Sequence, residues 1–167
     1  AAIRLFSSDL DGTLLGNPES TERFKQTWDR LEGQRPYLVY NTGRSVKDVR
    51  SLVAARKLPD PDFIIGGVGT ELFDPRRRAE LADFGSQFGE GWDLAMVEEI
   101  VSSTPGVERQ PPEFLHPYKS SWYWHHASRE NIAELQRRLQ EAGLQVSVVY
   151  SSLRDLDVLP ARATKGN

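Results

Sequence analysis

Cysteine is absent from this chain of 167 residues, and histidine is scarce, with 3 residues. The lack of thiols excludes disulfides, cysteine-based metal sites and a thiol nucleophile, and it is compatible with the reducing cytoplasm, where we expect the protein to reside. Long apolar runs are missing too, since no stretch approaches the roughly 20 residues that a membrane span requires. No basic segment followed by an apolar one opens the chain, so no secretory signal is visible. We expect neither a membrane protein nor a secreted one.

Positive charge is not in excess either. The chain has 21 Lys and Arg against 24 Asp and Glu, a formal net charge of −3, and its one run of basic residues is 76–78. This argues against a nucleic-acid partner. With 38% hydrophobic and 27% charged residues, the composition is typical of a soluble globular protein. At roughly 150 residues per domain the chain forms one ordinary domain or two small ones, and nothing in it indicates an oligomeric state.

The first third of the chain alternates strands and helices. Residues 3–6, 37–40 and 63–65 are short apolar runs typical of buried strands. Helical spacing of apolar residues follows two polar residues that predict N-caps, Thr21 and Ser45. The resulting β-α-β-α-β order predicts a parallel sheet covered by helices.

Composition changes after Phe73, where glycine and proline become frequent as far as Pro112. The elements predicted in the remainder are a helix at 92–101, a strand from 119 to 124, a helix from 128 to 143 and two strands at 146–150 and 153–159. We interpret this part as an inserted α+β segment with antiparallel strands. The expected domains are residues 1–84 as the first part of a core, 85–160 as the insertion and 161–167 as the return to the core.

Two carboxylates follow the first predicted strand in the sequence Asp9-Leu10-Asp11-Gly12-Thr13. Ligands of open parallel sheets bind at the carboxyl ends of the strands, so both aspartates lie where a site is expected. One carboxylate can act as a nucleophile and the other can donate a proton to the leaving group. The alternative is an ordinary turn rich in Asp and Gly.

The second strand ends in Asn41-Thr42-Gly43-Arg44-Ser45, followed by a helix. A hydroxyl, a flexible glycine and a helix N-terminus at one sheet edge can cradle an anion, or Ser45 can simply cap the helix. Arg44 either binds a substrate anion or lies on the surface. Lys165 by itself indicates no function, and it is a candidate only because it follows residues 9–13 and 41–45 in the sequence.

These three segments resemble motifs I, II and III of the haloacid dehalogenase superfamily of phosphatases: residues 6–14, residues 41–44 and Lys165. The insertion resembles the superfamily's α/β cap of type C2. Residues 68–71, 116–119 and 151–167 further resemble the sucrose-phosphate phosphatase group and its disaccharide-phosphatase relatives. The resemblance implies an α/β fold with a doubly wound parallel sheet and a C2 cap. The motif IV loop would lie after Asn167, so the core is expected to be incomplete at its C-terminus and the chain to be a fragment of a longer protein.

The resemblance also implies roles for individual residues. Asp9 would be the nucleophile that forms an aspartyl-phosphate, and Asp11 the general acid and base. Thr42, Gly43 and Lys165 would bind the phosphoryl group, which carries the developing charge. Mg²⁺ would be held by the Asp9 carboxylate and the Asp11 backbone carbonyl, both hard oxygen ligands.

Arg44, Glu71 and Lys119 are the candidate substrate-binding residues, the last two by resemblance to positions that face the sugar. Tyr118, Trp122 and Trp124 either stack on a sugar ring or belong to the core of the insertion. The three histidines do not show the spacing of a metal site.

The expected function is therefore an Mg²⁺-dependent hydrolase of a disaccharide phosphate of the sucrose 6-phosphate type. Mannosylfructose phosphate and glucosylglycerol phosphate are alternative substrates, because a few contacts decide sugar identity. A different class of function is a catalytically silent phosphosugar-binding or regulatory module of a glycosyltransferase. The presence of both Asp9 and Asp11 argues against it, since such a module needs neither carboxylate.

Overall fold

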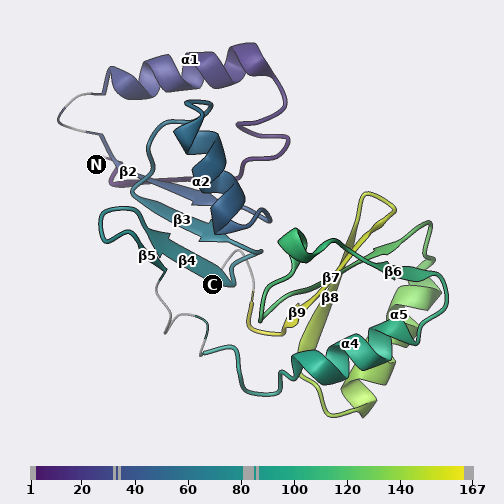
Figure 1. Ribbon diagram of the computed structural model, residues 1–167. Coiled ribbons are helices and arrows are strands. Elements are labelled where there is room, and N and C mark those ends of the chain that lie inside the picture. Colours follow the sequence, from purple (N-terminus) through teal and green to yellow (C-terminus); the bar gives the residue numbers. More distant parts are fainter. Residues whose placement is uncertain (1–2, 32, 34, 81–84, 86, 164–167) are drawn as a thin grey trace. The chain divides into compact units, whose positions relative to one another are not determined.

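A computed structural model describes residues 3–31, 33, 35–80, 85 and 87–163 (Figure 1). The chain divides into two compact units, one within residues 1–84 and the other within residues 85–165. Their interpretation as core and cap, with a return at 161–167, stays a prediction, and Lys165 lies outside the described residues. Within the described ranges, no helix is both long enough and apolar enough to cross a membrane.

The first unit is built on three parallel strands joined by two helices. The strands are β1 (Leu5–Ser8), β2 (Tyr37–Asn41) and β3 (Phe63–Gly66), and the helices are α1 (Pro18–Asp29) and α2 (Val46–Ala54). β1 pairs in parallel with β2, and β2 with β3. The predicted β-α-β-α-β order and its parallel pairing are confirmed.

A hairpin that the sequence analysis missed extends this sheet. β4 (Glu71–Asp74) pairs antiparallel with β3, and β5 (Ala79–Glu80) pairs antiparallel with β4. The Asp74 carboxylate accepts hydrogen bonds from the backbone N–H groups of Arg76 at 2.9 Å and Arg77 at 3.3 Å, which fixes the turn between them. Strands of four and two residues are too short to show a clear alternation of polar and apolar residues.

The predicted start of α1 at Thr21 is wrong. Asn17 is the N-cap, with its side chain accepting from the backbone N–H of Ser20, and Pro18 occupies the first helical position, which suits a residue without an N–H. Thr21 lies inside the helix, where its hydroxyl donates to the carbonyls of Leu14 and Asn17. The second prediction is confirmed, because the Ser45 side chain caps α2 by accepting from Asp48 N.

The core of the first unit draws on both helices and on the sheet. Its buried members are Leu10, Trp28, Leu38, Tyr40, Val46, Val49, Leu58, Ile64 and Phe73. The ring of Phe6 on β1 lies 5.8 Å from that of Phe24 and 5.6 Å from that of Trp28, so aromatic contacts hold α1 beside the strand that precedes Asp9.

The second unit is a four-stranded antiparallel sheet with two long helices (Figure 1). Its elements are α4 (Leu94–Ser102), β6 (Val107–Arg109), the 3₁₀ helix η1 (Pro112–Phe114), β7 (Ser120–Trp124), α5 (Arg129–Glu141), β8 (Val146–Ser151) and β9 (Asp155–Pro160). The strand order is β6-β7-β9-β8 and each pairing is antiparallel, as expected for the insertion. Trp122 and Trp124 are buried in the core that α4 and α5 share with this sheet, which favours the packing interpretation of both residues.

Candidate active site

The two aspartates and the Thr42 loop leave the sheet at the same edge. In the parallel pairing of β1 with β2, Ser8 lies opposite Tyr40, so Asp9 and Asn41 are the next residues along adjacent strands. Carboxyl ends of parallel strands gather residues that are distant in sequence, and this is where such folds bind ligands.

The turn after β1 is anchored by Leu10, which is fully buried between the two aspartates. The Leu10 carbonyl accepts from the backbone N–H of Thr13 at 3.1 Å and of Leu15 at 2.7 Å. Gly12 has a φ of +72°, in the left-handed region that favours glycine, and donates its N–H to Leu15 O at 2.8 Å. Asp9 is half-buried and Asp11 is exposed, so the anchored turn presents the second carboxylate to solvent.

Thr42 is fully buried and held by its backbone. Its N–H donates to Ile65 O at 3.0 Å, and its carbonyl accepts from Val68 N at 3.2 Å. The Thr42 hydroxyl oxygen accepts from Arg44 N at 3.2 Å. A hydroxyl that accepts in this way keeps its proton to donate, which is what a phosphoryl oxygen needs from it.

Arg44 contacts Asp11 directly. Its Nε lies 2.8 Å from Asp11 Oδ2 and its Nη2 lies 2.7 Å from Asp11 Oδ1, a bidentate pair, while Nη1 lies 2.5 Å from Asp48 Oδ2. The hydrogen bonds to Asp11 raise the pKa of Arg44 above its ordinary value, partial burial opposes this, and the bond to Asp48 adds to it. The guanidinium therefore stays charged, and its planar fork fixes the orientation of the Asp11 carboxylate.

The N-terminus of α2 holds a carboxylate of the chain itself. Glu71 Oε2 accepts from Val46 N, at the first residue of the helix, at 2.7 Å. The helix terminus that the sequence predicted to cradle an anion is thus occupied in part by Glu71, in addition to its Ser45 cap. An added Cβ at Gly66 would lie 2.9 Å from both Arg44 O and Val46 N, so only glycine allows this close approach.

Lys119 belongs to the second unit and is 8% exposed. Its Nζ lies 3.7 Å from Asp157 Oδ1, and the same oxygen accepts from the Ser121 hydroxyl at 2.7 Å. These contacts give Lys119 a structural role in its own unit, whatever it contributes to a substrate.

The predicted metal ligands suit Mg²⁺ by their chemistry. A carboxylate and a backbone carbonyl are hard oxygen donors, and Mg²⁺ is commonly held by one or two carboxylates with waters and substrate phosphates completing its shell. Across the part of the chain that the structure describes, no group of three or more His, Cys, Asp or Glu side chains could hold a metal ion. The assignment of Mg²⁺ to Asp9 and Asp11 stays a prediction.

Of the predicted site residues, the structure joins Asp11, Thr42 and Arg44 through hydrogen bonds. Asp48, the second partner of Arg44, is absent from the predicted site residues. A signal was present in the i, i+4 spacing of the two residues, which brings opposite charges together at the start of a helix.

Comparison with known proteins gives a consistent relationship. A family model described as sucrose-6F-phosphate phosphohydrolase matches residues 2–167. The chain is 39% identical over 165 residues to mannosylfructose-phosphate phosphatase of Agrobacterium fabrum, which covers 98% of this chain and 66% of that protein. It is 32% identical over 171 residues to sucrose-phosphatase 1 of Nicotiana tabacum, which covers 99% of this chain and 40% of that protein. The chain thus spans less than two thirds of the length of these relatives.

Solved structures give the same relationship. The sucrose-phosphatase of Synechocystis sp. PCC6803, in complex with sucrose and phosphate, has a TM-score of 0.88 and 30% identity, over 99% of this chain and 67% of that one. A haloacid dehalogenase-like hydrolase of Bacteroides thetaiotaomicron has a TM-score of 0.67 at 17% identity, over 98% of this chain and 73% of that one. Both likenesses confirm the expected haloacid dehalogenase fold. With its family model matched almost from end to end, the chain belongs to the sucrose-6F-phosphate phosphohydrolase family of that superfamily.

Proposed function

We propose that the protein hydrolyses the phosphomonoester of a disaccharide phosphate. The observation that carries the proposal is the placement of Asp9 and Asp11 at the carboxyl end of β1, with Asp11 held by Arg44 from the neighbouring loop. The reaction needs a nucleophile and a proton donor at the same phosphoryl group, and the family model that matches the chain is described as sucrose-6F-phosphate phosphohydrolase.

The proposed reaction has two steps. A carboxylate oxygen of Asp9 attacks phosphorus, the bond between phosphorus and the sugar oxygen breaks, and Asp11 gives its proton to that leaving oxygen. Asp11 then removes a proton from a water molecule that attacks phosphorus in the acyl phosphate, which releases inorganic phosphate and restores Asp9. When bound to the Asp9 carboxylate and the Asp11 carbonyl, Mg²⁺ supplies positive charge that offsets the repulsion between carboxylates and phosphate.

Binding of the phosphoryl group is assigned in this proposal to the Thr42 hydroxyl, Gly43 and Lys165. The buried, backbone-held position of Thr42 supports its part, because a fixed donor costs no reorganisation when the transition state forms. The role of Lys165 rests on the family resemblance alone, because Lys165 lies outside the described residues.

Arg44 has a role in this proposal different from direct substrate binding. All three of its side-chain nitrogens that could bind an anion already contact Asp11 or Asp48. We therefore assign it as a positioning residue that holds the Asp11 carboxylate in the free protein, and its bond to one Asp11 oxygen must break when that oxygen carries the proton for the leaving group. Glu71 and Lys119 stay candidates for sugar selection, although each already has a structural partner in its own unit.

Phosphate release from purified protein tests the activity. Sucrose 6F-phosphate, mannosylfructose phosphate and glucosylglycerol phosphate are compared with and without Mg²⁺, and with a chelator in excess. We expect release from at least one of them that needs Mg²⁺ and is abolished by Asp9→Asn, a change that keeps the shape of the side chain and removes its charge. The identity of 39% to a mannosylfructose-phosphate phosphatase makes that compound the first to test.

The catalytically silent module gives a different result. It would bind a phosphosugar with measurable affinity and release no phosphate from it under any metal condition. Full activity in the presence of excess chelator would contradict the metal requirement while leaving the hydrolase assignment intact.

A further inference from the structure

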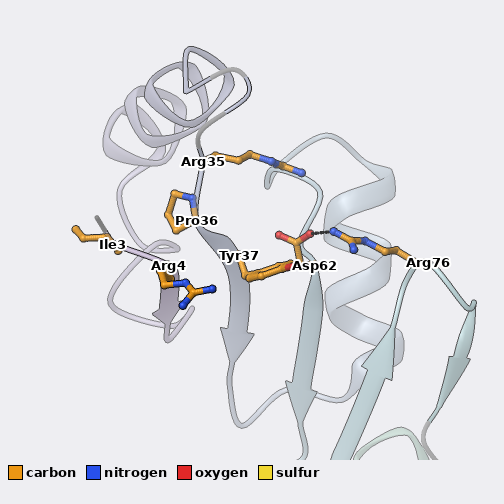
Figure 2. A pocket seen from close by; sticks show the side chains of 7 residues that line it. All are labelled: Ile3, Arg4, Arg35, Pro36, Tyr37, Asp62 and Arg76. Carbon is orange, nitrogen blue, oxygen red and sulfur yellow. Dashed lines mark hydrogen bonds and ion pairs between the residues drawn. The ribbon is translucent and has the colours of Figure 1, made fainter. Parts of the chain in front are cut away.

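A pocket of about 370 Å³ lies at the opposite end of the strands from Asp9 (Figure 2). Arg4 immediately precedes β1, Tyr37 begins β2, and Asp62 immediately precedes β3, so all three mark the amino ends of the parallel strands. Arg35 and Arg76 complete its charged lining. At a rise of about 3.3 Å per strand residue, Arg4 and Asp9 are roughly 16 Å apart along the chain, so this pocket is separate from the candidate active site.

The single carboxylate of the pocket is already used. Asp62 is 5% exposed, its Oδ1 lies 2.6 Å from Arg76 Nη2, and its Oδ2 accepts from Leu38 N at 2.8 Å. Figure 2 shows the pair of Asp62 and Arg76 at one side of the pocket. With both oxygens engaged, Asp62 neutralises Arg76 and has little capacity left for another cation.

Arg4 and Arg35 differ from Arg76 in lacking an acidic partner among the described residues. In the described part of the chain, neither guanidinium has a carboxylate within ion-pair distance. Together with the neutralised pair, they give the pocket a local charge of about +2 in a chain whose net charge is −3. Two uncompensated guanidinium groups beside one hollow create a positive potential that attracts anions.

The chemistry of the lining favours a phosphate group. Guanidinium forks bind phosphate oxygens in pairs, with a geometry that ammonium groups lack. Tyr37 is half-exposed, and the Arg76 guanidinium lies 5.7 Å from its ring centroid, so an aromatic surface borders the charged groups. We propose that this pocket binds the phosphate group of a small anion, through Arg4 and Arg35, as a second site independent of the chemistry at Asp9.

NMR titration of the Asp9→Asn protein with inorganic phosphate, and separately with sucrose 6F-phosphate, tests the proposal. The Asp9→Asn background prevents turnover. Backbone amides of Tyr37 and Leu38 report on the pocket, and those of Gly12 and Arg44 report on the active site. Saturable shifts of the first pair are expected, and Arg4→Ala and Arg35→Ala should each weaken that binding about tenfold. In these two variants, the shifts of the Gly12 and Arg44 amides should match those of the Asp9→Asn parent.

Arg129→Ala is the matched control, since it removes one exposed positive charge from the second unit. Thermal unfolding of each variant should stay close to that of the parent, because Arg4 and Arg35 make no ion pair in the described residues. Tighter binding of the sugar phosphate than of phosphate would identify a phosphomonoester as the ligand, and equal binding would identify phosphate itself. The proposal is overturned if the shift changes of the Tyr37 and Leu38 amides do not saturate. It is also overturned if Arg129→Ala weakens binding as much as Arg35→Ala does.

Discussion

Replacing Arg44 by alanine removes the group that holds the Asp11 carboxylate through hydrogen bonds of 2.7 and 2.8 Å. If Arg44 positions a general acid, its loss should matter most when the leaving oxygen needs a proton. A sugar alkoxide leaves poorly without protonation, whereas an aryl oxide such as p-nitrophenolate leaves readily. Arg44→Ala should therefore slow turnover of the disaccharide phosphate much more than turnover of p-nitrophenyl phosphate, although the phosphoryl group is the same in both substrates.

The magnitudes follow from exposure and from the role of the acid. The Arg44 and Asp11 side chains are 33% and 58% exposed, so their ion pair contributes about 1 kcal/mol or less to stability, and Arg44→Ala should fold. A positioned general acid contributes about 10²–10⁴-fold to a rate. Losing its orientation but not its carboxylate should lower kcat for the disaccharide phosphate by roughly ten- to a hundredfold, within that contribution.

Steady-state kinetics on both substrates give the answer. In Arg44→Ala, we expect kcat on p-nitrophenyl phosphate to fall about twofold at most. Arg44→Lys should recover part of the lost kcat on the disaccharide phosphate. Adding Arg44→Ala to Asp11→Asn should cause little further loss, because the two residues act as a unit. Asp48→Asn is the matched control, since it removes the charge of the other partner of Arg44 and leaves the pair with Asp11. Equal losses on both substrates would refute the reasoning and would indicate that Arg44 binds the phosphoryl group itself.

Gly66→Ala should lower the free energy of unfolding by about 1–3 kcal/mol, because the new Cβ would lie 2.9 Å from backbone atoms. At Gly43 the nearest neighbour of a new Cβ is a side-chain atom at 3.8 Å, so Gly43→Ala should fold normally and be impaired only in phosphate release. Chemical denaturation checks both. Lys119→Ala should lower stability by about 1–3 kcal/mol by leaving Asp157 without its cation. A role of Lys119 in sugar selection should appear as a further loss on the disaccharide phosphate that p-nitrophenyl phosphate does not show. Burial raises the pKa of Tyr40 above its ordinary 10.0, so the unfolded chain ionises first, and stability should fall as pH rises above 10. Tyr40→Phe should reduce this loss in alkaline denaturation curves.

Elements with a strong local pattern could be predicted from the sequence. The three parallel strands are compact apolar runs, and α2 begins at a serine cap followed by apolar residues at helical spacing. The carboxylates of Asp9 and Asp11 could be placed for the same reason, since a strand that ends in polar residues brings them to a known edge of a parallel sheet.

Features that depend on contacts between distant residues could not be predicted. Arg44 and Asp11 are 33 positions apart, and the sequence does not determine where a long side chain will point. The pocket lined by Arg4, Arg35 and Arg76 could not be predicted either, because these residues come from three separate segments that only the fold brings together. The predicted N-cap of α1, Thr21, lies one helical turn from the observed cap, Asn17, because both residue types can cap a helix and only the backbone conformation decides which one does.

The identity of the nucleophile is the central claim, and trapping of the covalent intermediate tests it most directly. Protein mixed with Mg²⁺ and the disaccharide phosphate that it turns over is quenched and treated with borohydride, which reduces the carbonyl of a phosphorylated aspartate, releases phosphate and leaves homoserine. Peptide mass spectrometry then locates the modified residue. Reduction is expected at Asp9; it should depend on substrate and be absent in Asp9→Asn. Reduction at another residue, or turnover with no acyl phosphate at any aspartate, would contradict it.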